Sequence, residues 1–297
     1  MNKKKSSPAH GLALSPKTHW TFVDSVTFSI VDDPLTSVTR GQGIAYDAKT
    51  KRVFFSGMLT TDLPTSTGLA RDTVEYAQEH VKTPAVPAYF FENYGSNHLG
   101  SIDVFDGEIL APLEDKRPKG QEDYLYPILA AFDQDTLSYA EKYTILPRDE
   151  DQDDGLPWVA GDEASGIIYT SKYKNATKLN KFPIGSLWTG TPLREQLILS
   201  EAITRVQAGR IYEHHLYVIA DEELKAISLG SGNVTPVTLS DYLPESPGPG
   251  TIYEWEHESL AFFPRDNGSL LHVTAILRVK IGFLPFIPYA VVVFDFK

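Results

Sequence analysis

One pattern of apolar and polar positions occurs five times along the chain. Each instance begins with a strand of small residues, passes through an acidic turn and continues into a β-branched or aromatic strand, which is typical of a β-hairpin. The five instances are QGIAYDAKTKRVFFSG (42–57), SIDVFDGEILAPLE (101–114), PWVAGDEASGIIYTSK (157–172), AGRIYEHHLYVIAD (208–221) and ESLAFFPRDNGSLLHV (258–273).

The instances return at a nearly constant interval. Successive turns begin at Asp47, Asp106, Asp162, Glu213 and Phe263, which are 50 to 59 residues apart. A period of about 50 residues, with several short strands in each unit, is the signature of a β-propeller. The pattern therefore predicts an all-β, five-bladed propeller, with a six-bladed ring as the alternative. Two β-sandwich domains are a further alternative, but their strands would not return at this interval.

The two ends of the chain predict how the ring closes. The fifth unit lacks an outer strand, and HWTFVDSVTFSIVD (19–32) precedes the first unit without a partner of its own. We expect this N-terminal strand to complete the last blade and remove an exposed sheet edge. Residues 18–297 then form a single propeller domain, and the polar residues 1–17 form a disordered N-terminus.

One segment departs from the strand pattern. Residues 65–81 place Leu69, Val74, Ala77 and Val81 at helical spacing inside the first unit. This spacing predicts a helical insertion on one face of the ring, and an ordinary surface loop is the alternative.

Propeller geometry gathers residues that are distant in sequence. The innermost strand of each blade begins near the central channel, so its first residues lie on one shared rim. Histidines and carboxylates on that rim can exchange protons, arginines can hold an anion, and aromatic or amide side chains can orient a ligand. The candidate catalytic residues are Glu258, His98, His257 and Asp103; the candidate substrate-binding residues are Arg40, Gln42, Trp158, Gln207, Arg210 and Glu256. For each of them, an ordinary structural role at a water-filled channel is the alternative.

Composition excludes several classes of function. The formal net charge is −12, which argues against duplex nucleic acid and anionic membranes as partners, because both need clustered Lys and Arg. The chain has no cysteine, which excludes thiol catalysis and disulfides. No apolar stretch is long enough to insert through a membrane. Sequons at Asn175, Asn233 and Asn267 are compatible with a secreted glycoprotein; coincidence in a chain rich in Ser and Thr, with a cytoplasmic location, is the alternative.

Familiar cofactor and metal motifs do not occur. RDEDQDDGLP (148–157) is rich in acids, but it lacks the glycine and glutamate that a calcium-binding EF-hand loop requires at its sixth and twelfth positions. We expect a solvated acidic loop there, with weak ion binding left open. The sequence contains no G-x-S-x-G, phosphate-binding loop or H-E-x-x-H motif.

The segments QGIAYDAKTKRVFFSG, HLGSIDVFDGEILAPLED and EHESLAFFPRDNGSLLHV resemble the superfamily of small-molecule propellers. That superfamily includes gluconolactonase-like and calcium-activated nucleotidase-like enzymes, glutamine cyclotransferases and propellers from fungal biosynthetic clusters. The resemblance implies a ligand in the funnel and, in gluconolactonase-like members, a metal held by carboxylate and Asn side chains. Here Glu258 matches such a position, with Asp103 as a second candidate, but no Asn stands at the others. We therefore expect no cofactor and leave a divalent metal such as calcium open.

Two functions follow as hypotheses. The first is a cofactor-independent hydrolase, lyase or cyclase/isomerase that acts on a small organic molecule by general acid/base chemistry, with secondary metabolism as one setting. Glu258 would be the acid or base, with His98 and His257 as its partners. Arg40 or Arg210 would hold an anion, and Trp158 would form a wall. The alternative is a non-catalytic propeller that binds a small ligand, a glycan or a protein.

Overall fold

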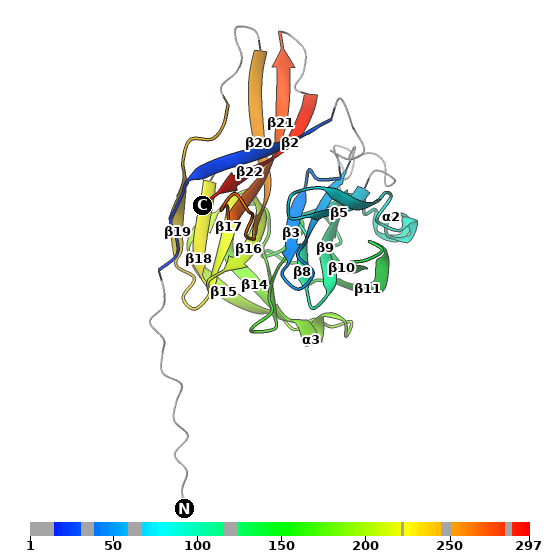
Figure 1. Ribbon diagram of the computed structural model, residues 1–297. Helices are drawn as coiled ribbons and strands as arrows, with labels where there is room; N and C mark the ends of the chain where they lie inside the picture. Colours follow the sequence, from blue (N-terminus) through cyan, green and yellow to red (C-terminus); the bar gives the residue numbers. More distant parts are fainter. Residues whose placement is uncertain are drawn as a thin grey trace, which may run out of the picture.

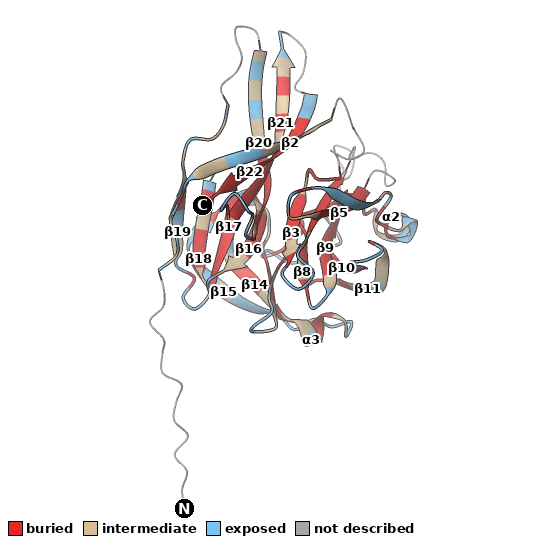
Figure 2. Cartoon of the chain, viewed as in Figure 1, coloured by how far each residue is buried: buried red, intermediate tan, exposed pale blue. Residues whose placement is uncertain are grey.

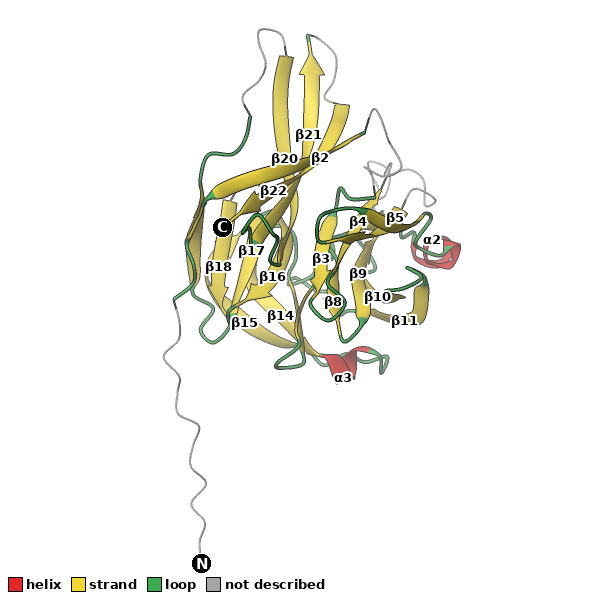
Figure 3. Ribbon diagram, in the orientation of Figure 1, coloured by secondary structure: helices red, strands yellow, loops and turns green. Residues whose placement is uncertain are grey.

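The computed structural model describes residues 15–30, 39–58, 67–115, 124–220, 223–244, 251–282 and 287–297. Its strands form five sheets that are arranged radially as a five-bladed β-propeller (Figure 1). Strands dominate the described residues, and only two short helices, α2 (Ala88–Tyr94) and α3 (Ile184–Leu187), accompany them (Figure 3). The predicted all-β, five-bladed fold is confirmed, and the six-bladed alternative is wrong. The predicted disordered N-terminus lies almost entirely outside the described residues.

Each blade is a twisted antiparallel sheet built from consecutive strands. In chain order, the blades contain β3 (Gly43–Asp47), β4 (Arg52–Met58), β5 (Thr67–Thr73) and β6 (Gln78–Lys82); β7 (His98–Leu99), β8 (Asp103–Phe105), β9 (Glu108–Glu114), β10 (Ile128–Asp133) and β11 (Tyr139–Ile145); β12 (Ala160–Asp162), β13 (Ile167–Thr170), β14 (Ala176–Pro183) and β15 (Glu195–Ile203); β16 (Val206–Tyr212), β17 (His215–Ala220), β18 (Glu223–Ser228) and β19 (Val234–Leu239); β20 (Thr251–Phe262), β21 (Leu271–Ile281) and β22 (Ile287–Phe296).

Burial follows the position of a strand within its blade (Figure 2). Every residue of β17 is buried, whereas most residues of the outer strand β15 are exposed. The apolar residues of neighbouring blades form the core between the sheets. This gradient explains why β17 reads as a continuous apolar run in the sequence, because both of its faces pack against other blades.

The innermost strands hold the ring together. β3, β8, β12, β16 and β20 contact one another in a closed cycle. Between the second and third blades, the backbone N–H of Ser101 donates to Pro157 O at 2.8 Å, and the N–H of Val159 donates to Ser101 O at 3.2 Å. Side-chain contacts continue this cycle, since Ser101 Oγ and Ser259 Oγ lie 2.8 Å apart across the centre.

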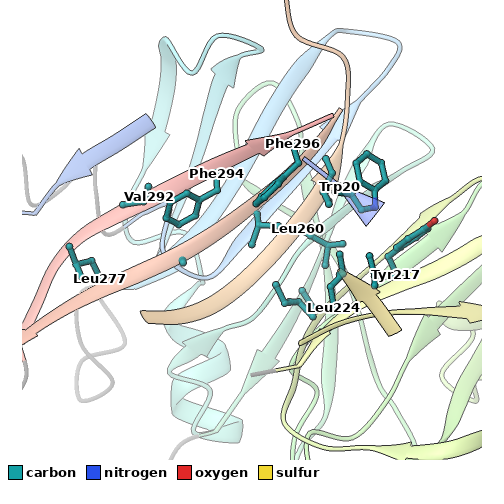
Figure 4. Packing of buried hydrophobic residues seen from close by; sticks show 14 of the residues in the cluster. Trp20, Tyr217, Leu224, Leu260, Leu277, Val292, Phe294 and Phe296 are labelled. Atoms are coloured by element: carbon teal, nitrogen blue, oxygen red, sulfur yellow. The ribbon is translucent and has the colours of Figure 1, made fainter. Parts of the chain in front are cut away.

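The N-terminal segment fastens the last two blades. β2 (Phe22–Ser29) pairs antiparallel with β22 and completes the fifth blade, so the predicted closure is confirmed. β1 (His19–Trp20) adds a parallel strand to β19 of the fourth blade, which the sequence did not predict. The Trp20 side chain is buried among residues of both blades, including Tyr217, Leu260 and Phe296 (Figure 4). One short segment therefore covers two outer edges and fills the core between them.

The predicted helix at residues 65–81 is wrong. In the described part of this segment, β5 and β6 form a hairpin, and β5 also pairs with β4. Leu69 is fully buried in β5, and Tyr76 turns its ring into the core from the turn between the strands. The segment forms strands despite its helical spacing, because β4 would otherwise have an unpaired edge.

The fifth blade is longer than the others. β20 and β21 contain 12 and 11 residues, whereas β8 and β12 contain 3 residues each. The additional residues rise beyond the ring on one side of the molecule (Figure 1). No helix among the described residues is long and apolar enough to cross a membrane.

Candidate functional site

A cavity of about 350 Å³, the axial cavity, lies at one end of the central axis. Side chains from all five blades line it. They include Gln42 from the first blade, His98 and Glu114 from the second, Asp154 and Tyr173 from the third, Gln207 from the fourth, and Glu256, Glu258 and Arg278 from the fifth. Gln42 and Glu258, which are 216 residues apart in the chain, thus meet in one space, although Glu258 lies inside β20 and not at its beginning as predicted.

A β-bulge aims Glu258 at the axial cavity. The register between β20 and β21 shifts between His257 and Ser259, so Glu258 is an extra residue in its strand. Two successive side chains therefore face the axis: Glu258 lines the cavity, and the Ser259 hydroxyl accepts a hydrogen bond from the Ile44 N–H at 3.1 Å. β16 has a similar register shift around Gln207, another residue of this cavity. Bulges commonly redirect a side chain next to an active site.

His98 is held by a carboxylate. It lies directly opposite Glu114 in the pairing of β7 with β9, and its Nδ1 is 3.0 Å from Glu114 Oε2. Both side chains are buried, with 7% and 5% of their surface exposed. A carboxylate beside a buried imidazole restricts the orientation of the ring. The pair is therefore suited to accept and return a proton.

Gly155 leaves the space that the Glu114 carboxylate occupies. Its φ angle is +113°, and a Cβ at this position would lie 2.2 Å from Glu114 Oε1. A residue with a side chain would be strained and would displace the carboxylate. The glycine thus allows the backbone of the third blade to pass close to the His98–Glu114 pair.

The acidic segment 148–157 is attached to the third blade and is not the solvated loop that we expected. Asp151 pairs with Lys178 at 2.8 Å, and Asp149 pairs with Arg194. Asp154 accepts hydrogen bonds from the backbone N–H groups of Tyr173 and Lys174 at 2.7 and 2.6 Å. Most of these carboxylates are used for anchoring, which a count of acidic residues cannot reveal.

The axial cavity is electrostatically negative. Four carboxylates, those of Glu114, Asp154, Glu256 and Glu258, line it together with a single arginine, Arg278. Arg278 forms an ion pair with Glu256. Burial raises the pKa of Asp154, although the two backbone N–H groups lower it. The excess of carboxylates favours ligands that carry a positive charge or several hydrogen-bond donors.

The structure brings five of the predicted site residues together in the axial cavity: Gln42, His98, Gln207, Glu256 and Glu258. Their chemical roles stay predictions. The other five predicted residues lie elsewhere, and each has an identifiable structural environment.

Arg40 and Trp158 lie in the protein interior. The Arg40 guanidinium is fully buried and pairs with Asp72 at 2.6 Å, so its charge is compensated within the first blade. The Trp158 ring packs against Gly209 between the third and fourth blades, and its Nε1 donates to Ser171 Oγ at 3.1 Å. Neither residue lines the axial cavity, so Arg40 is not placed to hold an anion there and Trp158 is not its wall.

Arg210 and Asp103 line a different cavity of about 320 Å³, the opposite cavity. The buried Arg210 guanidinium donates to the carbonyl oxygens of Ile44, Ile102 and Val159, which belong to three other blades. Asp103 lies 3.6 Å from Arg210 Nε and accepts the Gly161 N–H at 2.8 Å. Burial raises the pKa of Asp103, and the charge of Arg210 opposes this shift. This arrangement joins the innermost strands.

His257 faces a third cavity of about 550 Å³, the side cavity, between the fourth and fifth blades. Its Nε2 is hydrogen-bonded to the Tyr242 hydroxyl. The side cavity shares Gln207, Glu256 and Arg278 with the axial cavity. Glu256 lines both cavities, whereas His257 lines the side cavity and not the axial cavity.

Sequence reasoning missed several residues of the axial cavity. Glu114 ends one of the repeated segments, and its pairing with His98 could have been found by aligning the two strands. Asp154 was present in the acidic segment but was assigned to solvent. Arg278 and Tyr173 gave no signal, because their neighbours in space come from other blades.

The described residues contain no group of three or more His, Asp or Glu side chains that could hold a metal ion. The three sequon asparagines, Asn175, Asn233 and Asn267, are exposed and lie between strands. Glycosylation and secretion stay predictions.

No protein-family model and no curated protein matches the chain. Among solved structures, it is similar to the glutaminyl cyclase of Myxococcus xanthus, with 10% identity, a TM-score of 0.52, and coverage of 95% of this chain and 100% of that chain. It is also similar to the tail fibre of Staphylococcus aureus phage P68, with 11% identity, a TM-score of 0.52 and coverage of 94% and 52%. A luciferin-regenerating enzyme has 13% identity, a TM-score of 0.47 and coverage of 91% and 95%.

The chain shares the propeller fold of these proteins. The predicted resemblance to small-molecule propellers is thereby confirmed at the level of the fold. An enzyme and a phage tail fibre have equal TM-scores to this chain, so the fold alone does not identify a reaction. The function has to be argued from the axial cavity.

Proposed function

We propose that this protein is a cofactor-independent enzyme that acts on a small organic molecule by general acid/base chemistry in the axial cavity. The observation that carries the proposal is the meeting of the His98–Glu114 pair with Glu258 in one cavity lined by all five blades. Two proton-exchanging groups from different blades, neither fully exposed, are what such a reaction requires.

Each group has a defined role in the proposal. Glu114 orients His98, and His98 exchanges one proton with the substrate. Glu258 exchanges the second proton, so that one group acts as base while the other acts as acid. Gln42 and Gln207 orient the substrate by hydrogen bonds from its two sides.

The charge of the cavity defines the substrate class. Four carboxylates against one arginine attract an amine or another cationic group. The reaction is then a hydrolysis, an elimination or a ring closure of a small amine-bearing molecule, since each of these moves one proton onto the substrate and removes another.

The experiment compares wild-type protein with Glu258→Gln and His98→Ala in a mixture of small amine-bearing metabolites, with conversion followed by mass spectrometry. Loss of either group should reduce turnover by about 10²- to 10⁴-fold. Glu201→Gln, at an exposed residue outside the axial cavity, should leave turnover unchanged. If a ligand binds equally to wild type and to Glu258→Gln and no molecule is converted, the protein is a binding propeller and the proposal fails.

A further inference from the structure

The part of β20 that rises beyond the ring is an edge strand. The fifth blade has the strand order β2–β22–β21–β20, so among the described strands β20 pairs only with β21. In an antiparallel sheet, alternate residues of an edge strand direct their N–H and C=O groups away from the sheet. Such an edge binds another extended chain if nothing covers it.

The side cavity runs along this edge. Glu254, Trp255, Glu256 and His257 are consecutive in β20, and all four line the cavity. Successive side chains of a strand point to opposite faces, so four consecutive residues can line one cavity only if it meets the strand edge-on. The facing wall also contains consecutive residues, Ala202 to Arg205, at the end of β15 and after it.

Edges nearer the ring are used by the protein itself. The side-chain hydroxyl of Ser259 in β20 accepts the Ile44 N–H of the first blade, and the backbone of Ser101 exchanges hydrogen bonds with the third blade. For Glu254, Trp255 and Glu256, the backbone hydrogen bonds among the described residues are those made with β21. The backbone groups of these residues that point away from β21 therefore meet the side cavity.

We propose that the side cavity binds an extended peptide segment that adds to β20 as a further strand. An extended peptide is the ligand whose N–H and C=O groups repeat at the spacing of a strand edge. The cavity volume of about 550 Å³ lies within the range of ligand sites. The walls carry little uncompensated charge, since Lys225 pairs with Glu201 and Glu223, and Arg278 pairs with Glu256. Backbone hydrogen bonds, and not charge, therefore supply most of the affinity.

The continuity of the two cavities orients the peptide. Gln207, Glu256 and Arg278 form the boundary between the side cavity and the axial cavity. The boundary consists of side chains, which can move apart, and the carboxylates of Glu114, Asp154 and Glu258 lie beyond it in the axial cavity. A peptide along β20 would thus present an amino terminus or a basic residue to the negative end. The occupant is a short free peptide, whose charged amino terminus matches these carboxylates.

The experiment uses short peptides of alternating Ala and Val, and of alternating Ala and Lys, with binding measured by calorimetry. Each peptide is compared with two analogues, one N-methylated at every second residue and one N-methylated throughout. An added strand uses only alternate N–H groups, so the half-methylated analogue should still bind and the fully methylated one should bind at least about tenfold more weakly. Backbone amides within residues 251–257 should gain protection from hydrogen exchange when the unmodified peptide binds.

Two protein variants give a matched control. Ala202→Trp fills the side cavity from an exposed position, whereas Ala48→Trp makes the same change at an exposed residue of the opposite cavity. The first should abolish binding and the second should leave it unchanged. Amino-terminal acetylation of the peptide should weaken binding, because it removes the charge that faces the axial cavity, and an unchanged affinity would contradict a free peptide as the occupant.

The proposal is overturned if no peptide of the set binds at millimolar concentration, if the fully methylated analogues bind as well as the unmodified ones, or if both tryptophan variants behave alike. Its failure is distinguishable from failure of the proposed enzyme. Peptide binding should persist in Glu258→Gln, whereas turnover should not.

Discussion

The Nδ1 atom of His272 lies 2.8 Å from Asp295 Oδ1, and neither side chain has exposed surface. The other ring nitrogen, Nε2, lies 2.7 Å from the carbonyl oxygen of Phe263. Nδ1 also lies 2.9 Å from the Tyr76 hydroxyl, so both ring nitrogens have hydrogen-bond partners. The Tyr76 hydroxyl from the first blade donates to Asp295 Oδ1 at 3.2 Å. A buried polar network thus joins the first blade to the last.

Breaking this network should destabilise the ring. Asp295→Asn removes a buried carboxylate that His272, Arg265 and Tyr76 all contact, and it leaves Arg265 paired with the half-exposed Glu75. We expect the free energy of unfolding to fall by about 3–5 kcal/mol. Urea denaturation at neutral pH measures it. Asp135→Asn, at a carboxylate with 79% of its side chain exposed, should change stability by less than about 1 kcal/mol. Equal effects of the two substitutions would contradict a role for the network.

The same carboxylate predicts a dependence on acid. Burial raises the pKa of Asp295, but the hydrogen bond from His272 and the charges of His272 and Arg265 outweigh burial and lower it. A lowered pKa in the folded state stabilises the protein above the unfolded value, near pH 4, and this contribution is lost as the pH falls further. The stability difference between wild type and Asp295→Asn should be constant from about pH 5 upward and shrink below about pH 4. A difference that grows on acidification would exclude this origin.

Gly155→Ala should impair the proposed reaction more than it impairs folding. The new Cβ would press on Glu114 Oε1 and displace the partner of His98. A displacement of about 1 Å can lower kcat by about 10²-fold. Gly268→Ala is the matched control, because it has a similar positive φ of +82° but no atom within 4 Å of the new Cβ. Both variants carry the backbone strain, so only the loss specific to Gly155 reports on Glu114.

Arg210 should act as a structural link between blades. Lysine cannot reproduce the planar set of donors that contacts carbonyl groups of Ile44, Ile102 and Val159. Arg210→Lys should lower the free energy of unfolding by several kcal/mol, about the cost of breaking a buried ion pair. Arg194→Lys, in a surface pair with Asp149, should cost less than about 1 kcal/mol. If Arg210→Lys were as stable as wild type, the carbonyl contacts would not hold the ring together.

Trp20 should be required for closure of the ring. Its ring packs against Tyr212 and Phe262 in the core between the last two blades. Trp20→Ala should cost about 3–5 kcal/mol and expose the N-terminal strand to proteolysis. His19→Ala changes the exposed neighbour in the same short strand and should have little effect. Limited proteolysis with mass spectrometry of the N-terminal fragments compares the two.

The architecture could be predicted from the sequence because each blade is built mainly from one continuous stretch of the chain. Its strands are consecutive, and its turns and apolar runs are repeated about every 50 residues, so the pattern in 42–57 returns in 258–273. Closure by residues 19–32 followed from a unit that lacked a strand. The hairpin at residues 67–82 did not follow, because its strand identity depends on pairing with β4 and not on its own spacing.

The sequence by itself determined the repeated blades and placed His98 and Glu258 near the centre of the ring. Only the tertiary structure decided which side chains face the axial cavity. Strand register decides the bulge at Glu258 and the pairing of His98 with Glu114. Contacts between blades decide where the Arg210 side chain lies. A shift of one residue turns a side chain to the opposite face of its strand, and no local sequence pattern records that shift.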